Sequence, residues 1–312
     1  MVLIKLIDKN FPLLIPLMLM TGMLLGDLIV DFRVWVPWIF AFVTFIGALR
    51  IDFDSFKQTI KKPKPMIGVL SILRLFMPLW ALLLGRFIFP GYIDTQIGLL
   101  LFALIPVGVN SVLWTVLHQG NVALTLSVVL LDTLLSPLLL PLSVLLLTGV
   151  PIRLETAGLM MSLLQMVVLP SLVGMMVNQL TKGVLFKKWH RKLIPVSKMG
   201  LLTVMMINGS TVRDDFTTVD LQWVGVMVSI VFLAVSGYTM SWYLAKLLKL
   251  GEADTKAVVF SGGMRNISAG IVIAVAYFPA AVAVPMVTGV FFQQMVCVTV
   301  AKWLKRHYHK AR

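Results

Sequence analysis

Long apolar segments follow one another along most of this chain, and they restrict its fold more than any other feature. A helix that crosses a lipid bilayer needs about 20 predominantly apolar residues. Segments of about that length occur at 11–30, 34–50, 67–89, 96–117, 121–147, 157–180, 194–210, 221–247, 255–277 and 280–303. Because a backbone in lipid must satisfy its own hydrogen bonds, these segments predict an all-α integral membrane protein with ten transmembrane helices.

The composition excludes several classes of protein. Apolar residues make up 59% of the chain and charged residues 13%, against about 45–50% and about 25% in a soluble domain. The sequence has no phosphate-binding loop, paired-carboxylate motif or nucleophile elbow, so we expect no enzymatic activity. The lone Cys297 excludes a disulfide framework. The four histidines lack metal-ligand spacing, so we expect no metal or organic cofactor.

The formal charge of +14 reflects membrane topology and gives no indication of a nucleic-acid partner. With ten spans and both termini on one side, 21 of the 27 lysines and arginines lie on that side. Only Arg33, Arg86, Arg153 and Arg213 lie in the opposite loops. Basic residues concentrate in cytoplasmic loops. We therefore predict a multi-pass protein of the cell membrane with cytoplasmic N- and C-termini.

The ten spans divide into two sets of five, residues 1–148 and 149–312. Because five is odd, a duplicated five-helix unit would insert in opposite orientations as an inverted repeat. The fourth span of each half is interrupted by small and polar residues, at Pro106–Ser111 and at Ser261–Ser268. Paired interruptions predict two broken helices that line a binding site. The alternative is a glycine-rich face for close helix packing.

Three charged residues lie inside predicted spans: Asp132, Arg74 and Arg265. A charge at the bilayer centre costs at least about 2.5–3.5 kcal/mol, so such residues usually face protein or water. The net charge of these three residues is +1 if all are ionised. This charge suits an organic anion whose carboxylate binds the two parallel N–H donors of an arginine guanidinium. Alternatively, Arg74 reaches the membrane interface, or Asp132 pairs with Arg265 or carries protons.

Short motifs in a fixed order carry a resemblance that covers nearly the whole chain. They are Gly47-Ala-Leu-Arg-Ile-Asp-Phe, Lys62-Pro-Lys-Pro-Met-Ile-Gly68, Leu75-Phe-Met-Pro78, Gln119-Gly-Asn-Val-Ala-Leu124, Leu134-Leu-Ser-Pro137, Leu169-Pro-Ser-Leu-Val-Gly174 and Gly263-Met-Arg-Asn-Ile-Ser-Ala269. In these motifs the chain resembles the bile acid:sodium symporter family.

The resemblance implies a core domain of spans 3–5 and 8–10 and a panel domain of spans 1, 2, 6 and 7. The broken spans 4 and 9 would cross near the membrane midplane, where helix N-termini favour an anion. The substrates would be small organic anions such as bile acids and other carboxylates. By position, the substrate-binding residues would be Val109, Asn110, Ser111, Arg265, Asn266, Gln293 and Gln294.

The family's sodium ligands are only partly present. Ser261 replaces a glutamate that serves both sodium sites, and Arg265 replaces a glutamine. Further ligand positions carry Leu73, Val112 and Val129. The positions of an ion site or charge pair would be Ser111, Thr125, Asp132, Ser261, Met264 and Arg265.

These substitutions predict a secondary active transporter or facilitator of a small organic anion in which a guanidinium, held by Asp132, stands in place of sodium. Transport would then be proton-linked or uncoupled. The alternatives are a sodium-coupled symporter with a non-standard ion site and a non-transporting membrane receptor or scaffold. Export of an oxyanion through a membrane cysteine is disfavoured, because Cys297 is expected away from both breaks. The oligomeric state is not defined by the sequence.

Overall fold

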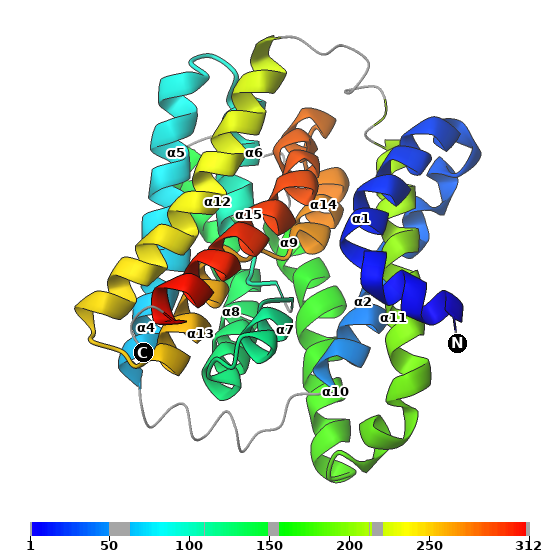
Figure 1. Cartoon of the computed structure of the whole chain (residues 1–312). Coiled ribbons are helices and arrows are strands. Elements are labelled where there is room, and N and C mark those ends of the chain that lie inside the picture. The colour runs from blue at the N-terminus through cyan, green and yellow to red at the C-terminus, as the bar shows by residue number, and fades with distance from the viewer. Residues whose placement is uncertain are drawn as a thin grey trace.

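The computed structural model describes residues 2–49, 63–108, 110–148, 156–211, 213 and 221–309. Within these ranges every named element is a helix (Figure 1). The α-helices are α1 (Val2–Leu25), α2 (Val36–Ala48), α4 (Pro63–Ser71), α5 (Met77–Ile88), α6 (Ile93–Leu104), α7 (Asn110–Leu117), α8 (Val122–Thr148), α9 (Thr156–Leu163), α10 (Leu169–Leu180), α11 (Val184–Thr211), α12 (Leu221–Leu247), α13 (Glu252–Gly263), α14 (Ile267–Tyr277) and α15 (Ala283–His309). Short helical turns complete the set: η1 (Gly26–Leu28), η2 (Val30–Trp35), η3 (Ile72–Phe76), η4 (Leu164–Val168) and η6 (Ala280–Val282).

The helices have the length and surface of an integral membrane protein. Among the described residues, 7 helical segments are long and apolar enough to cross a membrane, and three shorter apolar helices accompany them. Large apolar side chains lie on the outside, such as Phe87 with 88% and Leu24 with 84% of its surface exposed. Lipid accounts for this exposure. Helices occupy all ten predicted ranges, while the count of ten spans stays a prediction.

The bundle contains two π-helical turns, and each ends two residues before a proline. Ile72–Phe76 (η3) precedes Pro78, and Leu164–Val168 (η4) precedes Pro170. Proline has no N–H for the carbonyl four residues earlier, and a wider turn accommodates the loss. Arg74 lies inside the first of these turns, so the proline determines where this side chain leaves the helix.

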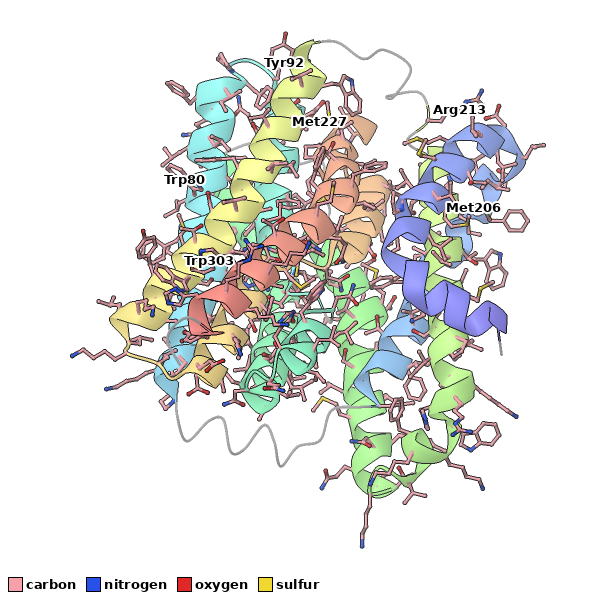
Figure 2. The ribbon with its side chains drawn as sticks, in the orientation of Figure 1. Trp80, Tyr92, Met206, Arg213, Met227 and Trp303 are labelled. Atoms are coloured by element: carbon pink, nitrogen blue, oxygen red, sulfur yellow. The ribbon has the colours of Figure 1, made fainter. Side chains whose placement is uncertain are left out.

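Two groups of helices are visible in Figure 1. Helices α1, α2, α10 and α11 pack together on one side, and α5 to α8 pack with α12 to α15 on the other. In the first group α1 and α11 approach closely at Gly22, where an added Cβ would lie 1.8 Å from the carbonyl oxygen of Met206. Met206 is labelled on α11 in Figure 2. The division into a core and a panel domain and the inverted repeat stay predictions.

Candidate functional site

The two interrupted helices meet where each leaves helical geometry. α6 ends at Leu104 and α13 at Gly263, and Val107 and Arg265 in the two gaps form an antiparallel β-bridge. The N–H of Gly108 donates to the carbonyl of Met264 at 3.2 Å, and the N–H of Asn266 donates to the carbonyl of Pro106 at 2.8 Å. We call residues 105–108 and 264–266 the crossing.

A side chain from a long helix binds the backbone of each segment of the crossing. The N–H of Val107 donates to Oδ2 of Asp132 on α8 at 2.8 Å. The N–H of Arg265 donates to Oε1 of Gln293 on α15 at 2.9 Å, and Nε2 of Gln293 donates to the Arg265 carbonyl at 3.0 Å. Buried backbone groups outside a helix need such partners. Asp132 and Gln293 therefore play the same role on the two sides of the bridge, each accepting a backbone N–H.

Asp132 is paired with Arg74. Arg74 Nε donates to Oδ1 of Asp132 at 2.6 Å, and its Nη2 donates to the Asp132 carbonyl at 2.7 Å. Its Nη1 donates to the carbonyl of Leu104 at 2.8 Å, which caps the broken end of α6. The structure thus excludes the alternative in which Arg74 reaches the membrane interface. The expectation that Asp132 holds Arg265 was wrong, because its carboxylate binds Arg74.

Arg265 consequently carries the uncompensated charge of the crossing. Arg265 is only 4% exposed. Both Nη1 and Nη2 are buried and have no hydrogen-bond partner among the described residues. A buried, unpaired guanidinium is costly unless an anion compensates it. A negatively charged group at this position would therefore be chemically favourable.

Two hydroxyl groups close to the crossing also lack partners. Ser111 lies on α7 and Ser261 on α13, two helices that pack against each other. Each residue is fully buried, and neither Oγ has a hydrogen-bond partner in the described part of the chain. Thr125 differs, because its Oγ1 lies 3.0 Å from Oγ1 of Thr115. Ser111 and Ser261 therefore have unused hydrogen-bonding capacity, whereas Thr125 is already engaged.

The structure places the other predicted residues as follows. Val109 lies outside the described residues. Asn110 is exposed at the start of α7, and Gln294 is half-buried on α15. Asn266 caps α14, since its Oδ1 accepts the N–H of Ala269 at 3.3 Å. Gln293 is buried with both ends of its amide bound to Arg265.

Met264 brings Cys297 to the crossing. Cys297 Sγ lies 3.8 Å from Sδ of Met264, and the cysteine is fully buried. The expectation that Cys297 is remote from both breaks was therefore wrong. The reason is helix register: Cys297 lies four residues after Gln293 on α15, so both side chains face the crossing.

The residues at the family's sodium positions do not fit a cation. Sodium needs several oxygen ligands and is favoured by a carboxylate. Both oxygens of Asp132 are engaged, one of them with the Arg74 cation. Arg265 adds a second buried positive charge at the crossing. The unpaired guanidinium N–H groups that remain are suited to an anion.

Interrupted helices that meet at a buried charged site inside a membrane bundle are the architecture of secondary transporters. A model of the Sodium Bile acid symporter family matches residues 37–219. The uncharacterized protein YbaS of Bacillus subtilis (strain 168) is 42% identical over 95% of this chain and 96% of its own length. The uncharacterized sodium-dependent transporter YocS of the same organism is 31% identical, over 80% and 78%. The probable sodium/metabolite cotransporter BASS1, chloroplastic, of Arabidopsis thaliana is 26% identical, over 76% and 58%.

The chain therefore belongs to the sodium bile acid symporter family. It is a transporter and not an enzyme.

Proposed function

We propose that this protein carries a small organic anion across the cell membrane by alternating access, and that Arg265 binds the anionic group. One observation supports this most strongly: both terminal nitrogens of Arg265 are buried and unpaired at the crossing. The proposal includes ten spans in a 5+5 inverted repeat, with both termini in the cytoplasm. The panel helices would rock against the core helices around the crossing.

A carboxylate is the proposed anionic group. The guanidinium offers two parallel N–H donors, which match the two oxygens of a carboxylate. The free hydroxyls of Ser111 and Ser261 add donors on α7 and α13. The name of the relative BASS1 speaks of a sodium/metabolite cotransporter, and a metabolite with a carboxylate fits these donors.

We further propose that transport does not depend on sodium. The positive charge of Arg265 would take the place that sodium holds in relatives. Asp132 is a poor proton carrier, because taking up a proton would break its ion pair with Arg74. An uncoupled facilitator is therefore favoured over a proton-linked carrier. The second candidate is a sodium-coupled symporter with a non-standard ion site, which the name of YocS favours.

Transport by the purified protein in proteoliposomes tests the substrate class. Monocarboxylates of increasing size, including a bile acid, would first be screened for their effect on thermal unfolding, and the best stabiliser would then be radiolabelled for uptake and counterflow. Arg265→Gln should weaken binding about 10- to 150-fold, the value of a charged hydrogen bond. Arg265→Lys, which keeps the charge but not the fork, should lose less. Equal transport by wild type and Arg265→Gln would refute the role of Arg265.

Replacement of sodium tests the coupling. Uptake in choline buffer should equal uptake in sodium buffer, and collapsing a proton gradient should leave it unchanged. Uptake that requires sodium would exclude the sodium-independent mechanism and leave the anion site intact. Binding with no counterflow at all would indicate a receptor or scaffold.

A further inference from the structure

A membrane-facing groove is lined mainly by α12 and α15, and Arg265 is not one of its lining residues. Its volume is about 640 Å³. α12 contributes a single helix face, with Val231, Val235, Tyr238 and Trp242 at intervals of four, three and four residues. The lining is mostly aliphatic and aromatic, and Trp303 of α15 lies beside α12 at one end (Figure 2). We call this cavity the α12/α15 groove.

The length of the groove matches one leaflet of a bilayer. On α12 it extends from Val231 to Tyr243, and on α15 from Phe292 to Trp303. At about 1.5 Å per residue these stretches are about 16–18 Å long. The hydrocarbon core of a bilayer is about 30 Å thick, so half of it is about 15 Å. An acyl chain of one leaflet therefore fits the groove from end to end.

One end of the groove has the features of a membrane–water interface. Trp242 and Trp303 pack edge to face with 5.2 Å between their ring centroids, and tryptophans concentrate at the interface. Lys246 and His307 lie one helical turn further on. Lys246 Nζ is 5.4 Å from the Trp242 ring and 3.5 Å from Nε2 of His307.

The positive charge at this end has no carboxylate partner among the described residues. Within the described part of the chain, no carboxylate forms an ion pair with Lys246. Lys246 and His307 are both exposed. A phosphate at the interface would therefore meet an ammonium and an imidazole directly above an apolar groove of acyl-chain length. This combination of charge and shape suits one class of ligand.

We infer that the α12/α15 groove binds one anionic phospholipid, with an acyl chain along the groove and the phosphate at Lys246 and His307. Phosphatidylglycerol has this chemistry, whereas the phosphocholine headgroup of phosphatidylcholine is net neutral. Each lysine near a bilayer surface contributes about 1 kcal/mol toward an anionic lipid, which corresponds to about fivefold in affinity. The inference does not depend on the transported substrate.

Native mass spectrometry of the delipidated full-length protein tests the site. Dioleoyl-phosphatidylglycerol should bind at one tight site, at least tenfold more strongly than dioleoyl-phosphatidylcholine, which has the same chains. Lys246→Gln should weaken binding of phosphatidylglycerol about fivefold and leave phosphatidylcholine unchanged. Lys249→Gln is the matched control, because Lys249 lies in the turn after α12, outside the groove. Thr299→Trp should fill the groove and weaken both lipids.

Several results would overturn the inference. Equal binding of the two lipids would do so, as would an equal loss in Lys246→Gln and Lys249→Gln, since either shows charge attraction without a site. Unchanged lipid binding in Thr299→Trp would show that the groove is not used. Loss of a dimer in Thr299→Trp with lipid binding unchanged would assign the groove to a second copy of the chain. Thermal unfolding of each variant confirms that it is folded.

Discussion

Replacing Arg74 should change the charge at the crossing without touching Arg265. In the structure Arg74 and Asp132 neutralise each other, so the crossing keeps one positive charge, on Arg265. Arg74→Gln would leave Asp132 with only the N–H of Val107 as a partner. The freed carboxylate is then drawn to the unpaired guanidinium of Arg265, and the net charge falls to zero. We expect Arg74→Gln to lose anion binding.

The magnitudes follow from the buried pair. A carboxylate left without its partner in a protein interior costs about 3–5 kcal/mol of stability. If Asp132 rotates to Arg265, the loss should be smaller than that range. Binding should fall about 10- to 150-fold, because a charged hydrogen bond contributes about 1.5–3 kcal/mol. In the double variant Arg74→Gln, Asp132→Asn no carboxylate competes for Arg265, so anion binding should return.

The assay is equilibrium binding of the radiolabelled carboxylate to detergent-purified protein, with thermal unfolding measured on the same samples. Wild type and the double variant should bind with similar affinity, and Arg74→Gln should bind far more weakly. Asp132→Asn alone keeps both arginines and should bind at least as well as wild type, if it folds. Wild-type affinity in folded Arg74→Gln would refute the electrostatic reasoning. Failure of the double variant to recover would show that Arg74 acts through the shape of the crossing.

Three further predictions concern residues around the crossing and at its rim. Gln293→Leu leaves the N–H and the carbonyl of Arg265 unpaired, which should cost about 1–3 kcal/mol of stability for each group. Thermal unfolding measures this loss. Gln293→Glu keeps an acceptor for the N–H and is the milder control. Cys297 is the only cysteine, so alkylation by a membrane-permeant maleimide reports on this position alone and can be followed by mass spectrometry. A carboxylate bound at Arg265 should slow the alkylation. An unchanged rate would place the anion elsewhere. Burial and the charge of Lys256 lower the pKa of His118 from its usual 6.5, so the unfolded chain binds the proton more readily and stability should fall as the pH drops below about 6.5. His118→Gln should flatten that decline, and an unchanged pH profile would contradict it.

The sequence predicts the helical membrane fold and the place of both breaks, because these depend on local properties. Apolar length determines which segments can enter lipid. Small and polar residues mark where a helix is interrupted, and the chain does leave helical geometry after Leu104 and after Gly263. The partners of the buried charges depend instead on side-chain direction. The π-helical turn before Pro78 contains Arg74, whose side chain reaches Asp132. The proline marks an irregularity in this helix, but the sequence alone does not give the direction in which Arg74 points.

The same limit applies to Gln293, which was expected to face the substrate. Its role becomes clear only when the two sides of the crossing are compared. Gln293 accepts the backbone N–H of Arg265, as Asp132 accepts the backbone N–H of Val107. Gln293 and Asp132 differ in one respect. A neutral amide can both accept and donate, so Gln293 binds the Arg265 N–H and carbonyl without needing a counter-ion. A carboxylate only accepts, and its charge requires Arg74. The charges of Asp132 and Arg74 therefore compensate each other. Gln293 is neutral, so it leaves the charge of Arg265 uncompensated. This difference between Asp132 and Gln293 is the structural basis of the proposal that Arg265 binds an anion.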